Sequence, residues 1–108
     1  MSKVLHLDNN NFELETKEGI CLVDFWAPWC GPCRMLSPVL DKLAEDQDIV
    51  SNNIKIIKVN VDENSELASK FEVRSIPAIY VIKDNNIVES IVGVKPFETL
   101  KSLLTSKI

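Results

Sequence analysis

Residues 20–44 read ICLVDFWAPWCGPCRMLSPVLDKLA, and this stretch decides the fold. Residues 20–26 form a nearly unbroken apolar run, which is typical of a central β-strand covered on both faces. The apolar side chains that follow recur at the period of an α-helix: Met35, Leu36, Val39, Leu40, Leu43 and Ala44. The motif Cys30-Gly31-Pro32-Cys33 therefore lies where a buried strand passes into a long helix.

Other strand-like segments lie on both sides of this stretch. Apolar and β-branched runs predict them at residues 3–7, 54–61, 78–83 and 87–92. The segment Asp84-Asn85-Asn86 joins the last two strands, and Asn tolerates the left-handed conformations that a tight hairpin requires. We therefore expect the sheet to end in an antiparallel hairpin.

Helical segments separate the earlier strands. We expect one helix over residues 8–18, capped by Asp8, with Phe12 and Leu14 as its apolar side. Another is expected over residues 65–71, and a last one begins at Pro96. Helices between early strands imply parallel crossovers. The order therefore predicts an α/β sandwich with a mixed five-stranded sheet.

Composition narrows the possible functions. A chain of 108 residues fits one domain, residues 1–108, and is large enough to bury a core. The net charge of −4 argues against nucleic acid, because phosphate binding needs a basic face. No apolar run approaches the roughly 20 residues of a membrane span. Met1-Ser2-Lys3-Val4 has no export-signal pattern, so we expect a protein of the reducing cytosol, apart from membranes.

The three cysteines do not suggest a framework of structural disulfides, because their number is odd. A zinc site is disfavoured, since zinc takes four ligands and only His6 and Cys21 remain to complete the pair. We therefore expect no metal. A Cys–His hydrolase is disfavoured too, because His6 has no orienting partner in the sequence. Cys21 is expected to be a small buried hydrophobe.

The position of the thiol pair predicts its chemistry. If Cys30 is the N-cap of the helix, the backbone N–H of Cys33 points at the Cys30 sulfur. That hydrogen bond and the helix dipole both stabilise a thiolate, the nucleophilic form of cysteine. Pro32 falls in the first turn, where its missing N–H costs nothing. The two thiols are also close enough to form a disulfide with modest adjustment.

Three segments together resemble the thioredoxin family. Residues 23–34 look like its active-site segment, Arg74-Ser75-Ile76-Pro77-Ala78 resembles its second active-site loop, and Val92-Gly93-Val94 resembles its third. The order of elements matches over essentially the whole chain. The resemblance implies the thioredoxin fold, a three-layer sandwich whose five-stranded sheet is flanked by four helices.

The resemblance also implies the reaction, which is reduction of protein disulfides by dithiol–disulfide exchange. Cys30 would be the exposed attacking thiolate, and Cys33 the buried thiol that resolves the mixed disulfide. The chain would be a monomeric electron donor in cell redox homeostasis and would bind no cofactor beyond its own Cys30–Cys33 disulfide. A thioredoxin reductase drawing on NADPH would regenerate it, and its other partners would be proteins that contain disulfides.

The substrate-binding surface is likewise implied by the family. Pro77 would be cis and would face the thiol pair, while the backbone of Ile76 would pair with an extended stretch of substrate. Gly93 would permit close approach at the border of an apolar docking surface. The implied substrate-binding residues are Trp29, Gly31, Pro32, Ile76, Pro77 and Gly93.

Asp24 is a single carboxylate within an apolar strand, which is costly if it is buried unpaired. Either it reaches water at a sheet edge, or it is a buried general acid/base below Cys33 with a raised pKa. The family has a lysine nearby, after the third strand, and Lys58 matches it. Trp26 is expected to pack in the core around the site.

Two other functions remain open on this sequence. The same fold can serve a thiol oxidant or isomerase, but a His beside the second cysteine goes with oxidising members, and Pro32 stands there instead. The chain could also be a non-catalytic docking subunit, although both cysteines are present.

Overall fold

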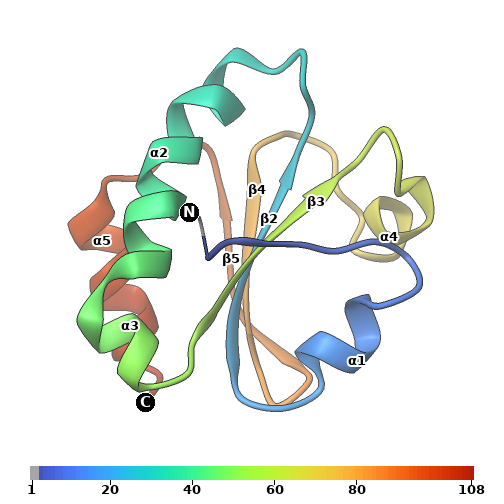
Figure 1. Cartoon of the computed structure of the whole chain (residues 1–108). Helices are drawn as coiled ribbons and strands as arrows, with labels where there is room; N and C mark the ends of the chain where they lie inside the picture. Colours follow the sequence, from blue (N-terminus) through green and yellow to red (C-terminus); the bar gives the residue numbers. More distant parts are fainter. Residues whose placement is uncertain (1–2) are drawn as a thin grey trace.

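A mixed five-stranded sheet runs through the middle of the molecule in the computed structural model, which describes residues 3–108 (Figure 1). The strand order is β1-β3-β2-β4-β5. Strands β1 and β2 pair in parallel with β3, whereas β4 pairs antiparallel with β2 and β5 antiparallel with β4. The strands are β1 Leu5–His6, β2 Ile20–Trp26, β3 Lys55–Asn60, β4 Ala78–Lys83 and β5 Asn86–Val92.

Helices cover both faces of the sheet, so the predicted three-layer sandwich is confirmed. Helices α2, α3 and α5 lie against one face and α1 and α4 against the other (Figure 1). Residues 3–108 contain five helices, one more than the four expected. They are α1 Phe12–Thr16, α2 Gly31–Glu45, α3 Gln47–Ser51, α4 Ser65–Lys70 and α5 Phe97–Thr105.

The additional helix is α3, and Asp46 explains it. The Asp46 side chain accepts hydrogen bonds from the backbone N–H groups of Asp48 (3.0 Å) and Ile49 (3.3 Å), which starts a new helix as α2 ends. Ile49 is fully buried in the core. A single apolar anchor leaves no periodicity in the sequence, so the sequence analysis did not predict this helix.

The expectation for α1 was wrong in its bounds and in one of its two apolar residues. Asp8 does not cap the helix but accepts hydrogen bonds from the N–H groups of Asn10 and Asn11, one turn earlier. The helix then begins at Phe12, which is buried, while Leu14 is exposed. A five-residue helix can present only one strong anchor to the sheet.

The side chains of β2 alternate between two cores. Leu22 packs with residues of α2 and α5, and Val23 and Phe25 pack with residues of α1 and α4. Because alternate residues of a strand share a face, Asp24 lies on the face covered by α2. This alternation places one carboxylate in an otherwise apolar layer.

The structure does not describe Met1 and Ser2, so the expectation that no export signal is present falls partly outside the described residues. Within residues 3–108, every helix is too short or too polar to cross a membrane.

The predicted hairpin between β4 and β5 is confirmed. Asp84 and Asn85 form its turn, both with positive φ (48° and 72°). The Asp84 carboxylate also accepts a hydrogen bond of 2.9 Å from the Gly19 N–H, which fixes the turn against the start of β2. The left-handed conformation predicted for this turn therefore falls on Asp84 and Asn85.

Replacing Asn85 tests this turn. We expect Asn85→Ala to lower the free energy of unfolding by about 1 kcal/mol, because a Cβ without a compensating polar group is disfavoured at positive φ. Asn85→Gly is the matched control and is expected to be neutral or slightly stabilising. Urea denaturation with a fixed m-value measures the difference. Equal stability of the two variants would contradict this role for the backbone conformation.

Candidate active site

Cys30 and Cys33 lie where β2 passes into α2, at the upper end of the sheet (Figure 1). Cys30 is the N-cap of α2, and its Sγ accepts a hydrogen bond of 3.2 Å from the backbone N–H of Cys33. The two cysteines form a disulfide, with their Cα atoms 5.2 Å apart. The predicted N-cap geometry is therefore confirmed.

The helix that follows favours negative charge at Cys30. Helix α2 has 15 residues, and its first turn carries no acidic side chain that would compete for the unpaired N–H groups. Pro32 lies in that turn, where it gives up no hydrogen bond. In the reduced protein, the same donors stabilise a thiolate on Cys30 relative to the thiol.

The expectation that Cys30 is exposed was wrong for this disulfide form. Its relative exposure is 5%, against 1% for Cys33, so both are buried and Cys30 is only the more accessible of the two. Cys30 packs beside Ala27 and Ile76, and its Sγ lies 3.8 Å from the Ile76 carbonyl oxygen. The loop that contains Ile76 packs against the loop that contains Cys30, and this contact reduces the exposure of Cys30. Sequence spacing does not show such a contact.

The second and third loops meet directly at this site. The Ile76–Pro77 peptide bond is cis, as the resemblance implied. The Gly93 N–H donates a hydrogen bond of 2.9 Å to the Pro77 carbonyl oxygen, which joins the two loops. Gly93 has φ 99°, a conformation that L side chains rarely adopt, so this position favours glycine. The three segments quoted from the sequence thus converge around the thiol pair.

Trp29 precedes Cys30 in the chain and faces solvent. Its side chain is 68% exposed, and its Nε1–H donates a hydrogen bond of 3.0 Å to Asp62 Oδ2. Asp62 was not expected at the site, because no local sequence pattern shows that the loop after β3 contacts the loop after β2. Other exposed apolar side chains in the segments next to the thiol pair are Met35, Val92 and Val94.

Asp24 is fully buried, so the edge-facing interpretation of this carboxylate is wrong. Neither carboxylate oxygen has a hydrogen-bond partner among residues 3–108. Burial raises the pKa of the Asp24 carboxyl to about 7, an effect that the positive charge of Lys58 opposes only in part. The site therefore contains a carboxyl group that exchanges a proton near neutral pH.

Lys58 lies within β3, directly opposite Asp24, and not after the strand as the family comparison implied. Its Nζ donates a hydrogen bond of 3.1 Å to Ser37 Oγ of α2 and lies 4.5 Å from the centroid of a Trp26 ring. The half-buried Trp26 thus packs around the site, as expected. No local sequence pattern indicates Ser37, because its partner Lys58 is 21 residues away.

Cys21 lies on the opposite face of β2 from Asp24 and is fully buried, as expected. Burial raises the pKa of its thiol to about 11, so Cys21 is not a reactive thiolate near neutral pH. Within residues 3–108, no three His, Cys, Asp or Glu side chains gather in a way that could hold a metal ion.

Comparisons with known proteins agree with this geometry. The family model described as Thioredoxin matches residues 3–106. Thioredoxin of Bacillus subtilis (strain 168) is 47% identical over 105 residues, which cover 97% of this chain and 98% of the relative. Thioredoxin of Staphylococcus saprophyticus is 46% identical over 101 residues, which cover 94% of each.

Solved structures show the same fold. A thioredoxin of Malassezia sympodialis, described as a member of a pan-allergen family, superposes with a TM-score of 0.84 at 28% identity, covering 98% of this chain and 91% of the other. A mutant thioredoxin of Halobacterium salinarum NRC-1 superposes with a TM-score of 0.83 at 35% identity, covering 98% and 93%.

Removing the Asp24 charge is expected to stabilise the protein above pH 7. The pKa of Asp24 is raised to about 7 in the folded protein and is about 4 when unfolded, so wild-type stability falls as the pH rises through this window. The variant Asp24→Asn avoids that cost. Its advantage is expected to be largest above pH 7 and to disappear below about pH 4, where both forms are neutral.

Urea denaturation between pH 3 and 9 measures this dependence. The control Glu18→Gln makes the same chemical change at an exposed carboxylate and is expected to show no such trend. A stability difference for Asp24→Asn that stays constant across the pH range would contradict the raised pKa.

Proposed function

The chain belongs to the thioredoxin family and is a protein-disulfide reductase, and from this premise we propose that Cys30, Cys33 and Asp24 perform its reaction. The observation that carries the proposal is the hydrogen bond from the Cys33 N–H to Cys30 Sγ at the start of α2. It distinguishes the two sulfurs, because only Cys30 is stabilised as a thiolate by the helix N-terminus.

In the first step, the reduced Cys30 thiolate attacks one sulfur of a target disulfide. A Cys30–target S–S bond forms while the target S–S bond breaks, and the departing target sulfur takes a proton from solvent. Cys30 is the more accessible of the two sulfurs, with 5% relative exposure against 1% for Cys33, which supports its role as the attacking sulfur.

In the second step, Cys33 attacks Cys30 Sγ and releases the target. The Cys33 thiol must lose its proton, and Asp24 is the group that we propose to accept it. The pKa of Asp24, about 7, suits a general base at neutral pH, and its burial keeps the carboxylate from being solvated by bulk water. The Cys30–target S–S bond breaks as the Cys30–Cys33 bond forms, and the departing target thiolate takes a proton from solvent to give the second target thiol.

The target segment is proposed to dock across the loops around the thiol pair. Strand β4 begins at Ala78, so the backbone of Ile76 lies ahead of the paired part of the sheet and is available to an extended peptide. Trp29, Gly31, Pro32 and Gly93 border the same region, with Pro77 held beneath it by the Gly93 N–H.

We also propose the physiological setting. A thioredoxin reductase using NADPH would return the disulfide to the dithiol, and the targets would be proteins with accessible disulfides. The protein would act as a monomer, with residues 1–108 as one domain, in the cytosol where that reductant is available. Gly31 and Pro32 between the thiols support this reducing role over that of an oxidant.

Reduction of insulin disulfides, coupled to NADPH consumption through a thioredoxin reductase, tests the roles of the two thiols. Cys30→Ser is expected to abolish reduction, because no nucleophile remains. Cys33→Ser is expected to accumulate a mixed disulfide with the target, visible by mass spectrometry. Reduction that survives Cys30→Ser would contradict the proposal. If a protein that carries both Cys30→Ser and Cys33→Ser binds a partner as well as the wild type does, a docking function would be favoured.

The role of Asp24 is tested on the second step alone. The mixed disulfide on Cys30 is formed and kept at low pH, where thiols are protonated and exchange slowly. After the pH is raised to 7, Asp24→Asn is expected to slow target release on the order of 100-fold, because Cys33 loses its general base. Rapid-quench measurement of released target gives the rate, and Glu18→Gln is the control. An unchanged rate would show that Asp24 is not the proton acceptor.

A further inference from the structure

Three titratable side chains lie in one row across the sheet. His6 of β1 is opposite Lys58 of β3, and Lys58 is opposite Asp24 of β2. Paired residues of parallel strands project from the same face, and Lys58 contacts Ser37 of α2, so the row lies on the α2 side. Strands are about 4.8 Å apart, which puts the Cα atoms of His6 and Asp24 roughly 10 Å apart.

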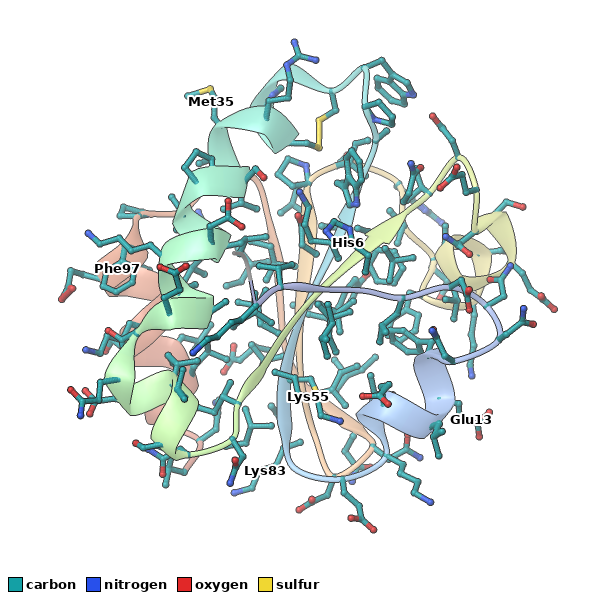
Figure 2. All side chains as sticks on the ribbon, viewed as in Figure 1. His6, Glu13, Met35, Lys55, Lys83 and Phe97 are labelled. Carbon is teal, nitrogen blue, oxygen red and sulfur yellow. A yellow bond between two sulfur atoms is a disulfide. The ribbon has the colours of Figure 1, made fainter. Side chains whose placement is uncertain are left out.

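Solvent exposure increases along this row. Asp24 is 0% exposed, Lys58 is 8% exposed, and His6 is exposed at the edge of the sheet. Figure 2 shows His6 pointing along the sheet toward the end that carries the thiol pair. The row therefore connects the buried carboxyl to solvent through one intermediate side chain.

A polar cavity of about 240 Å³ lies at the outer end of the row. At about 30 Å³ each, several water molecules would fit in it. The indole Nε1–H of Trp26 is buried without a hydrogen-bond partner among residues 3–108, and Trp26 lines this cavity. The lining residues are His6, Leu7, Asp8, Trp26, Lys58, Asn60, Glu63 and Asn64.

The proposed reaction requires such a route. Asp24 can accept the proton of Cys33 only as a carboxylate, so a protonated Asp24 must first lose its own proton before target can be released. Its oxygens have no hydrogen-bond partner among residues 3–108 and no solvent exposure, so direct release to bulk water is obstructed. Lys58 separates Asp24 from the cavity, and one of its three N–H donors binds Ser37, which leaves the others for water or for Asp24.

We propose that His6 is a proton relay that exchanges the proton of Asp24 with solvent through this cavity. The inference rests on the proposed role of Asp24. The proton leaves the Asp24 carboxyl along hydrogen-bonded water beside the Lys58 ammonium and is accepted by a neutral imidazole nitrogen of His6. His6 then gives it to buffer or bulk water, which restores the Asp24 carboxylate and the neutral imidazole. Imidazole suits this task because one ring nitrogen can accept a proton while the other donates one.

Other charged groups also face the cavity. Asp8 and Glu63 line it, and the Lys58 ammonium lies at its inner end. The Asp8 carboxylate is engaged by the N–H groups of Asn10 and Asn11, whereas Glu63 is exposed on the loop after β3. Glu63 is therefore the alternative relay against which His6 has to be compared.

The test uses release of target from a mixed disulfide that is formed at low pH and then brought to pH 7 in dilute buffer. His6→Gln keeps a polar side chain but cannot exchange a proton, and it is expected to slow release by about tenfold. This is less than the effect of losing a direct general base, because solvent still enters the cavity. Added imidazole is expected to restore the rate. Glu63→Gln is expected to be unaffected, and the melting temperatures of both variants confirm that they are folded.

The same measurement in an Asp24→Asn background separates the two proposals. There His6→Gln is expected to have no further effect, because no Asp24 proton remains to be relayed. If Asp24→Asn is slow but His6→Gln releases target as fast as the wild type, the relay is wrong and the role of Asp24 stands. The relay is also overturned if added imidazole does not restore the rate of His6→Gln. It is likewise overturned if His6→Gln still slows release in the Asp24→Asn background. A wild-type rate for Asp24→Asn overturns both.

Discussion

The active site depends on one hydrogen bond, from the Cys33 N–H to Cys30 Sγ. It exists because Cys30, in the loop between the end of β2 at Trp26 and the start of α2 at Gly31, keeps an extended backbone at the N-cap. The direction of that N–H is fixed by the axis of α2, which Leu36, Leu40 and Leu43 hold against the sheet. Packing of an apolar helix face, far from the thiols, therefore orients the donor that activates one of them.

The buried carboxylate of Asp24 is the second constraint. It interrupts the apolar layer beneath α2, where a hydrophobic residue would stabilise the fold, and Lys58 offsets its cost only in part. A local conflict between sequence pattern and packing of this kind is expected at functional sites. Strand pairing places Asp24 opposite Lys58 and Lys58 opposite His6. The register of β1, β3 and β2 therefore sets a row of side chains that runs from the buried Asp24 to the exposed His6.

Much of the architecture was predictable because it rests on short-range patterns. The apolar run of β2, the helical period of α2 and the turn at Asp84 and Asn85 each follow from neighbouring residues. Helix α3 was missed because one buried side chain, Ile49, carries no periodicity, and the start of α1 was misplaced because Asp8 caps a preceding turn. Asp62 and Ser37 were missed since their partners, Trp29 and Lys58, lie far away in the sequence.

The sequence by itself determined the thiol pair, its place at a strand-to-helix junction and the alternation of strands and helices, because propensity and capping act within a few residues. Only the tertiary structure decided that Asp24 is fully buried, that Lys58 reaches Ser37, and that Cys30 is largely covered by the Ile76 segment. Those features depend on strand register and on contacts between distant loops. A shift of one residue in the pairing of β2 and β3 would separate Asp24 from Lys58 without altering any local sequence signal.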